Sequence, residues 1–231
     1  MSLETRLLVE GSSLDGPGVH LVRHAESDLD WSAAEFPGQP DECWMQAGSV
    51  ASLWERGESA RLLSRAVDGF ASLGVGAWAV QMDRGRAGRQ LIGIGRLRLA
   101  SDADEVVNDQ LDLALFGIEG LDDEAKVQVA MRAIGGLAEI SRRNGTHVVQ
   151  SQYGDGLPGY HAAHMLDEVG FRPTRTEQNT DWYLGDPSHR QCELVVLPAG
   201  LARTAAERRV GERSLAAWRA FSERTSFEPR A

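Results

Sequence analysis

Two histidines and a tyrosine in the C-terminal half of the chain have side chains suited to proton transfer. His161 and His164 lie three residues apart, and Tyr153 precedes them by a short loop. A histidine can act as a general acid or base near neutral pH. The alternative interpretation is that both histidines are partly exposed helix residues that only form hydrogen bonds. Their spacing would also suit a metal ion, but no third ligand lies nearby in the sequence, so no metal site is predicted.

A second group of candidates ends the apolar stretch LDLALFGI at 111–118. Gly117, between Phe116 and Ile118, would let a ligand approach the backbone closely, although a glycine here also suits a bulge or a turn. Glu119 follows directly and could act as a general base. The alternative is that Glu119 is a solvated or helix-capping acid.

The spacing of apolar residues predicts the elements that would position these groups. From residue 19 the expected order is a strand (19–22), two helices (26–36 and 49–73), a hairpin (77–82 and 91–99), a strand (111–118), a helix (121–143), a strand (146–151), a helix (160–169), a final hairpin (182–184 and 192–197) and a helical tail (201–221). The hairpins and the two helical crossovers predict an α/β (α+β) fold, with a mixed, mainly antiparallel central sheet flanked by helices on both faces.

This order resembles the GNAT N-acetyltransferase superfamily. No single motif carries the resemblance; the succession of segments does. The segments are VHLVRHAESDLDW (19–31), AWAV (77–80) with LIGIGRLRL (91–99), LDLALFGI (111–118), the helix at 121–143 with THVVQS (146–151), and MLDEVGFRPT (165–174).

The resemblance implies an acyltransferase that moves an acyl group from acetyl-CoA or a similar acyl-CoA to the amine of a small molecule. In that family the pantetheine of coenzyme A pairs with the fourth strand, here 111–118, where it splays from the fifth strand, here 146–151. The resemblance therefore implies donor contacts at Phe116, Gly117, Ile118, Gln150 and Ser151, and catalytic groups among Glu119, Tyr153, His161 and His164.

The sequence departs from the family pattern where the pyrophosphate would bind. The family loop reads Arg/Gln-x-x-Gly-x-Gly/Ala and offers N–H groups at a helix N-terminus, whereas residues 118–124 read IEGLDDE. These acids favour a helix start but repel a phosphate. The family's usual tyrosine, four residues before the glycine of Gly-Phe, is Leu166 here. Two alternatives therefore stay open: an amide-forming relative that depends on an aminoacyl-tRNA or a carrier protein, and a non-catalytic GNAT-like binding module.

The segment LVRHAES (21–27) is similar to the motif after the first strand of histidine phosphatases, in which the histidine is phosphorylated. The second histidine of such an enzyme should follow a late strand, but THVVQSQYGDG (146–156) has none after its strand. The hairpin at 77–99 also has no place in that fold. A phosphatase is thus a remote alternative, which loss of phosphate-ester hydrolysis in His24→Ala would revive.

The composition and net charge exclude several other classes of protein. The chain has 231 residues, 42% hydrophobic and 25% charged, which excludes a disordered chain. No 18-residue apolar window and no signal peptide is visible, and Cys43 and Cys192 suit reduced thiols, so a cytoplasmic protein without a membrane contact is expected. The net charge of −10 disfavours general binding to phosphate backbones.

The expected domain boundaries follow from the same pass along the chain: an N-terminal segment (1–18), an acyltransferase-like domain (19–198) and a C-terminal helical extension (199–231). The extension has seven Arg and four Glu, a net of +3, and the rest of the chain carries −13. We expect it to dock on its own chain or on a second copy in a homodimer, or to contact a tRNA or carrier-protein donor. Trp31, Trp44 and Trp54 would line an acceptor pocket or, alternatively, pack in the core.

Overall fold

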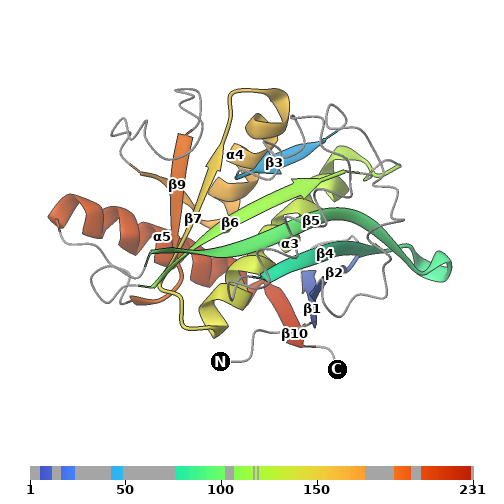
Figure 1. Ribbon diagram of the computed structural model, residues 1–231, viewed down its shortest axis with the longest axis horizontal. Coiled ribbons are helices and arrows are strands. Elements are labelled where there is room, and N and C mark those ends of the chain that lie inside the picture. The colour runs from blue at the N-terminus through green and yellow to red at the C-terminus, as the bar shows by residue number, and fades with distance from the viewer. Residues whose placement is uncertain are drawn as a thin grey trace.

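The computed structural model describes residues 6–11, 17–23, 43–48, 76–101, 107–116, 118, 120–174, 190–198 and 204–229. Within these ranges ten strands form one sheet in the order β10-β1-β2-β4-β5-β6-β7-β9-β8, and β3 pairs with β6 beside this path (Figure 1). The strands are β1 (Arg6–Gly11), β2 (Val19–Arg23), β3 (Met45–Ala47), β4 (Gly76–Asp83), β5 (Arg89–Ser101), β6 (Asn108–Leu115), β7 (Val148–Tyr153), β8 (Arg172–Pro173), β9 (Arg190–Val195) and β10 (Thr225–Pro229). The helices are α3 (Asp123–Arg143), α4 (Leu157–Val169) and α5 (Ala205–Glu223), with a short 3-10 helix η3 (Gly85–Ala87) in the β4–β5 turn.

The mainly antiparallel sheet confirms the predicted fold class. β4 and β5 form the expected hairpin, and β6 lies antiparallel beside β5. Of the strand pairs that the structure describes, β6 with β7 is the parallel one. The β4–β5 hairpin, which has no place in the histidine phosphatase fold, is present, so this topology contradicts the phosphatase alternative. His24 itself lies outside the described residues.

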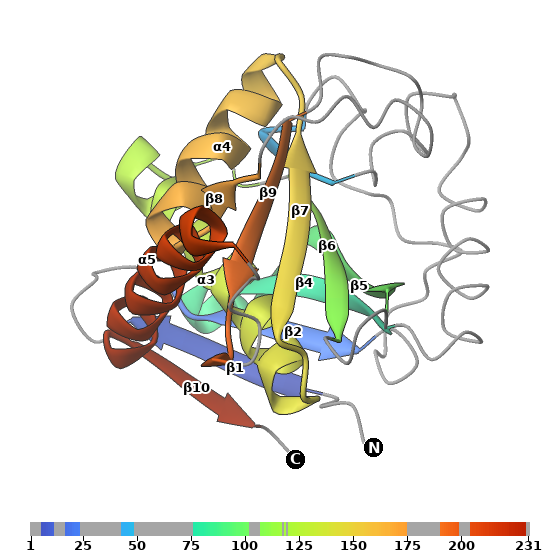
Figure 2. The same ribbon diagram turned by 90° about the vertical axis from the view of Figure 1, so that its left-hand side faces the viewer.

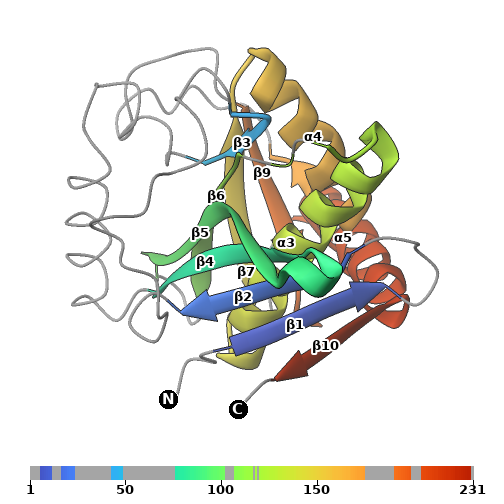
Figure 3. The ribbon, with the colours of Figure 1, turned by 90° about the vertical axis from the view of Figure 1, so that its right-hand side faces the viewer.

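The three described α-helices lie on one side of the sheet (Figures 2 and 3). α3 packs on the face that carries Leu113, because a Cβ on the register partner Gly95 would lie 2.7 Å from Leu137 of the helix. At the preceding residue of α3, a Cβ on Gly136 would lie 2.6 Å from Leu21 on β2. Glycine at this position lets the helix approach the sheet closely. The helices expected at 26–36 and 49–73 lie outside the described residues, as do Trp31 and Trp54.

Local signals place both ends of α3 as the sequence predicts. Asp122 is the N-cap, and its Oδ1 accepts a hydrogen bond of 2.8 Å from the N–H of Ala125. Arg142 and Arg143 occupy the last turn, where cations favour the negative end of the helix dipole. Gly145 follows with a φ of 86°, the left-handed conformation that terminates many helices.

The two ends of the described chain meet in the sheet, which the sequence did not indicate. β1 lies in the expected N-terminal segment and pairs antiparallel with β2 on one side and β10 on the other. β10 follows α5 in the expected C-terminal extension. Both flanking segments thus add a strand to the sheet of the central domain.

The C-terminal extension is a docked helix, as predicted. α5 begins with a capping box between Thr204 and Glu207. Leu215, Trp218 and Phe221 are buried in the main hydrophobic core, with Trp218 only 2% exposed. Residues 201–203 and the strand expected at 182–184 lie outside the described part of the chain. None of the helices in the described ranges has an apolar stretch long enough to cross a lipid bilayer.

Candidate functional site

β6 and β7 run together over a short distance and then part. Their parallel pairing covers three positions, Asn108–Gln110 with Val148–Gln150. The hydroxyl of Ser151 then donates a hydrogen bond of 2.9 Å to the carbonyl oxygen of Leu111. Beyond this link β6 continues to Leu115 unpaired with β7, so the strands enclose a gap at their carboxyl ends.

The chain fills this gap with one of its own segments. β3 pairs antiparallel with β6 at three positions, from Met45 opposite Leu115 to Ala47 opposite Leu113 (Figure 1). On the other side, the N–H of Gly48 donates a hydrogen bond of 2.6 Å to the carbonyl of Gln152 on β7. We call Cys43–Gly48 the wedge segment, since it bridges the two parting strands.

The wedge segment is packed on both faces of the sheet. Met45 and Ala47 are 0% exposed and belong to the main core beside α3 and α4. Cys43 packs on the opposite face with Ala114 and Phe116. Burial raises the pKa of the Cys43 thiol to about 12, so this cysteine is not a nucleophile near neutral pH.

Gly48 closes the wedge segment in a conformation that favours glycine. Its φ is 78°, and a Cβ there would lie 2.8 Å from the Cα of Asp112. Both the backbone conformation and the space therefore exclude an ordinary side chain at this position.

His161 contacts the wedge segment from α4. Its Nδ1 lies 2.7 Å from the carbonyl oxygen of Trp44, which can only accept, so Nδ1 carries the hydrogen. The two rings lie 4.6 Å apart at their centroids. Trp44 itself is partly buried against the core, which agrees with its packing interpretation. His164 is exposed on the same helix.

The other predicted site residues mostly have partners within the protein. Gln150 donates a hydrogen bond of 3.0 Å to Glu193, and Ser151 links β7 to β6.

Among the remaining predicted site residues, Phe116 and Ile118 are buried, 3% and 2% exposed. Tyr153 ends β7 partly buried, and burial raises the pKa of its phenol. Gly117 and Glu119 lie outside the described residues.

The start of α3 is acidic in space as well as in sequence. Asp122 caps the helix, and Asp123 and Glu124 are exposed in its first turn. Lys126 forms an ion pair of 3.4 Å with Asp123. Two carboxylates in the first turn and one at the cap occupy the positive end of the helix dipole, where they disfavour a bound phosphate.

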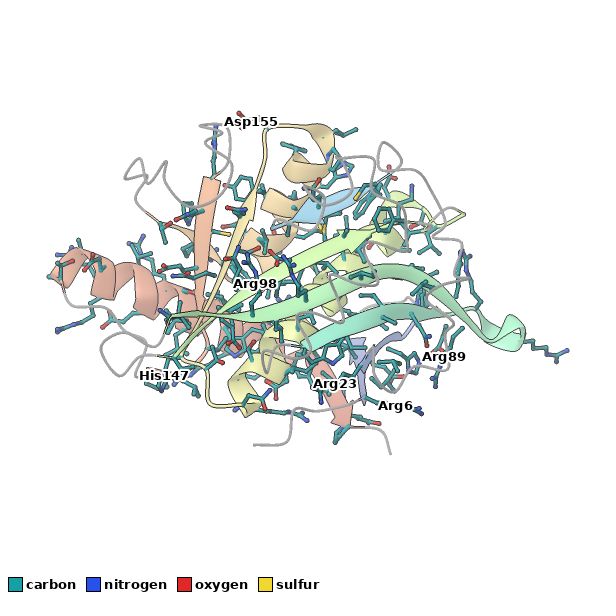
Figure 4. All side chains as sticks on the ribbon, in the orientation of Figure 1. Arg6, Arg23, Arg89, Arg98, His147 and Asp155 are labelled. Carbon is teal, nitrogen blue, oxygen red and sulfur yellow. The ribbon has the colours of Figure 1, made fainter. Side chains whose placement is uncertain are left out.

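Sequence reasoning missed a polar row on the face of the sheet opposite α3. Register pairs Arg98 with Gln110, Gln110 with Gln150, and Gln150 with Glu193, so these four side chains share one face. Figure 4 shows Arg98 over the middle of the sheet, away from Asp155 beyond the end of β7. The polar positions alternating with leucines in 109–113 (DQLDL) were the available signal, but they do not reveal the neighbouring strand.

Asp112 sits beside this row and is fully buried. Its Oδ2 accepts hydrogen bonds from Nε of Arg96 at 2.7 Å and from Nε of Arg98 at 3.2 Å. Two guanidinium groups therefore neutralise its charge. In the part of the chain that the structure describes, no group of three or more His, Cys, Asp or Glu could hold a metal ion.

No protein-family model matches the sequence, and no curated protein sequence matches it. Solved structures share its fold. A proposed ribosomal-protein-serine acetyltransferase from Vibrio cholerae is 11% identical, with a TM-score of 0.50 over 80% of this chain and 97% of that one. A proposed acetyltransferase from Salmonella typhimurium, solved with its cofactor acetyl-CoA, is 12% identical, with a TM-score of 0.45 over 64% and 79% of the two chains. An aminoglycoside 6'-acetyltransferase type Ii is 15% identical, with a TM-score of 0.44 over 74% and 97%.

Proposed function

From the GNAT acetyltransferase fold that this chain has, we propose that it is an acyltransferase acting on the amine of a small molecule. The observation that carries the proposal is the parting of β6 and β7 after three paired positions. It leaves an edge of β6 at Leu113–Leu115 that accepts an extended chain, since β3 pairs there. The amide-rich arm of an acyl thioester is such a chain.

The backbone edge of β6 fits a pantetheine arm, but only after the wedge segment has moved. The donor amides would then replace the hydrogen bonds that β3 makes with β6. The start of α3 does not fit a pyrophosphate, because Asp122, Asp123 and Glu124 occupy it. We therefore assign no phosphate contact there. The acyl donor is then either an acyl-CoA whose phosphates lie elsewhere, or an acyl group carried on a protein or a tRNA.

If the wedge segment moved away, groups on α4 and β7 would lose the hydrogen bonds that they now form with it. His161 would lose the Trp44 carbonyl as a partner, and Gln152 would lose the N–H of Gly48. Catalysis on such a surface depends mostly on positioning the two substrates side by side. The free thiols Cys43 and Cys192 suit a reducing compartment such as the cytoplasm.

Gly48→Ala tests whether the donor competes with the wedge segment. A residue other than glycine at a φ of 78° costs about 1–2 kcal/mol, and this cost falls on the closed state. Acetyl-CoA measured by titration calorimetry should then bind the variant up to roughly 30-fold more tightly than the wild type. Hydrogen exchange of residues 43–48 should accelerate in parallel.

Gly88→Ala is the matched control. Gly88 has a φ of 85° in the β4–β5 turn, and a Cβ there would meet nothing within 4 Å. Gly88→Ala therefore also places a side chain at a positive φ, but it leaves the wedge segment untouched. Equal affinities of acetyl-CoA for the two variants would contradict competition between the donor and the wedge segment.

A non-catalytic binding module is the second candidate function. The observation that favours it is the filled gap: Met45 and Ala47 are 0% exposed, as core residues are. The acidic start of α3 favours it as well. Under this hypothesis neither the wild type nor Gly48→Ala binds acetyl-CoA, and no amine is acylated.

A further inference from the structure

The polar row on the face opposite α3 crosses the sheet at the closed end of the gap. Gln110 and Gln150 are the last paired residues of β6 and β7, and Glu193 on β9 pairs with Gln150. All three side chains are partly buried. A donor lying along the free edge of β6 from the open end would bring its acyl carbon toward this closed end. The polar row is therefore the surface on which an acceptor would meet the acyl group.

Two carboxylates of the described residues face this surface beside the gap, and their surroundings differ. Asp112 accepts hydrogen bonds from Arg96 and Arg98, which hold its negative charge in place. Glu193 accepts a hydrogen bond of 3.0 Å from the neutral amide of Gln150. Two guanidinium groups therefore occupy Asp112, whereas the described partner of Glu193 is a neutral amide, which leaves Glu193 as the carboxylate that can accept a proton.

Within the described ranges, the charged groups near Glu193 do not neutralise it. Arg172 on β8 is its register partner, but its Nη1 donates to the carboxylate of Asp167 at 2.6 Å. Glu207 on α5 adds a second negative charge nearby. Burial and Glu207 raise the pKa of the Glu193 carboxyl, while the hydrogen bond from Gln150 opposes this rise.

We infer that Glu193 is the general base that takes the proton from the acceptor amine, with Gln150 as its positioning residue. The inference rests on the proposed acyl transfer. An acceptor ammonium gives one proton to the Glu193 carboxylate and becomes a neutral amine. Its lone pair forms the N–C bond to the acyl carbon of the thioester, and the C–S bond breaks with its electron pair going to the sulfur. The nitrogen then gives its surplus proton to this thiolate, so the products are a neutral amide and a thiol. Proton transfer to a positioned carboxylate contributes about 10²- to 10⁴-fold in rate.

The pH dependence of kcat/KM for acetyl-CoA with small primary amines tests this role. In the wild type, kcat/KM should fall on acidification as Glu193 becomes protonated. Glu193→Gln should lose about 10²- to 10⁴-fold and the acidic limb, while the affinity for acetyl-CoA stays unchanged. Gln150→Leu removes a hydrogen bond that lowers the pKa of Glu193, so its acidic limb should move to higher pH. Glu212→Gln, an exposed carboxylate on α5, is the matched control and should behave as the wild type.

Rescue of the activity by an added carboxylate distinguishes a chemical role of Glu193 from a structural one. Added acetate should restore part of the rate of Glu193→Ala, because a free carboxylate can occupy the space of the missing side chain. A Glu193→Gln variant that keeps the wild-type rate and acidic limb would overturn the inference and leave acyl transfer intact. A wild type that acylates no amine would instead overturn the proposed function, and this inference with it.

Discussion

Glu139 is a buried carboxylate on α3 whose charge is held by the next turn of the helix. Nε of Arg142 and Nε of Arg143 each lie 2.7 Å from its carboxylate oxygens. Burial by itself would raise the pKa of Glu139, but the hydrogen bonds and charges of the two arginines outweigh it and lower the pKa. Arg143 also donates to the carbonyl of Phe227, so the cluster connects α3 to β10.

Glu139→Gln should therefore destabilise the protein at neutral pH. A depressed pKa in the folded state gives stability that is complete above the unfolded pKa of about 4.3 and lost as the pH falls through the lower folded value. We expect the free energy of unfolding to fall by about 1–3 kcal/mol at pH 7 and to approach the wild-type value in acid. Urea denaturation between pH 7 and pH 3 measures this. A similar loss in the exposed control Glu168→Gln would contradict the assignment.

The ionised carboxylate of Glu193 should lower the free energy of unfolding, whereas that of Glu139 raises it. Its raised pKa means that the fold disfavours the ionised carboxylate, so stability is complete below the unfolded pKa and is lost as the pH rises through the folded one. Glu193→Gln is therefore expected to unfold at a higher temperature than the wild type at pH 7. The difference should shrink toward pH 4. A variant less stable than the wild type at pH 7 would show that the ionised form is favoured by the fold.

The acidic start of α3 is the feature of this chain that fits an acyl-CoA donor least well. Asparagine also caps helices, so Asp122→Asn together with Asp123→Asn should leave α3 intact. Each removed charge should weaken the repulsion of a coenzyme A phosphate at this helix end by about 0.3–1 kcal/mol, so the double variant should admit phosphates that the wild type repels. Calorimetry with acetyl-CoA, and with the phosphate-free thioester acetyl-pantetheine as control, measures the change. Unchanged affinity for acetyl-CoA would mean that its phosphates lie elsewhere.

The sheet joins both termini of the described chain, so the C-terminal extension should be needed for stability. Removal of residues after Pro198 takes away β10, which pairs with β1, and α5, which buries Trp218 and Phe221. We expect the shortened protein to melt well below the full chain, or to aggregate through the exposed edge of β1. Differential scanning calorimetry and light scattering measure these two outcomes. An unchanged melting temperature and mass would contradict a structural role for the tail.

The sequence by itself determined those helices and strands that depend on interactions between residues close together in the chain. The hairpin β4–β5 follows from two apolar stretches around a short polar turn, and its register needs no distant partner. The boundaries of α3 follow from Asp122 and Gly145, which act on the adjacent backbone. The docking of α5 follows from apolar residues spaced along one helical face. Together these elements were sufficient to indicate the fold.

Only the tertiary structure decided how the gap between β6 and β7 is filled and which carboxylate faces it. β3 has three residues, and its partners on β6 and β7 lie far away in the sequence, so no local pattern marks it as a strand. β1 and β10 escaped prediction for the same reason, since each needs the other as a partner. Glu193 joins Gln150 and Gln110 through register across three strands. Strand pairing is non-local, and a sequence read residue by residue contains the alternation of a strand but not the identity of its neighbour.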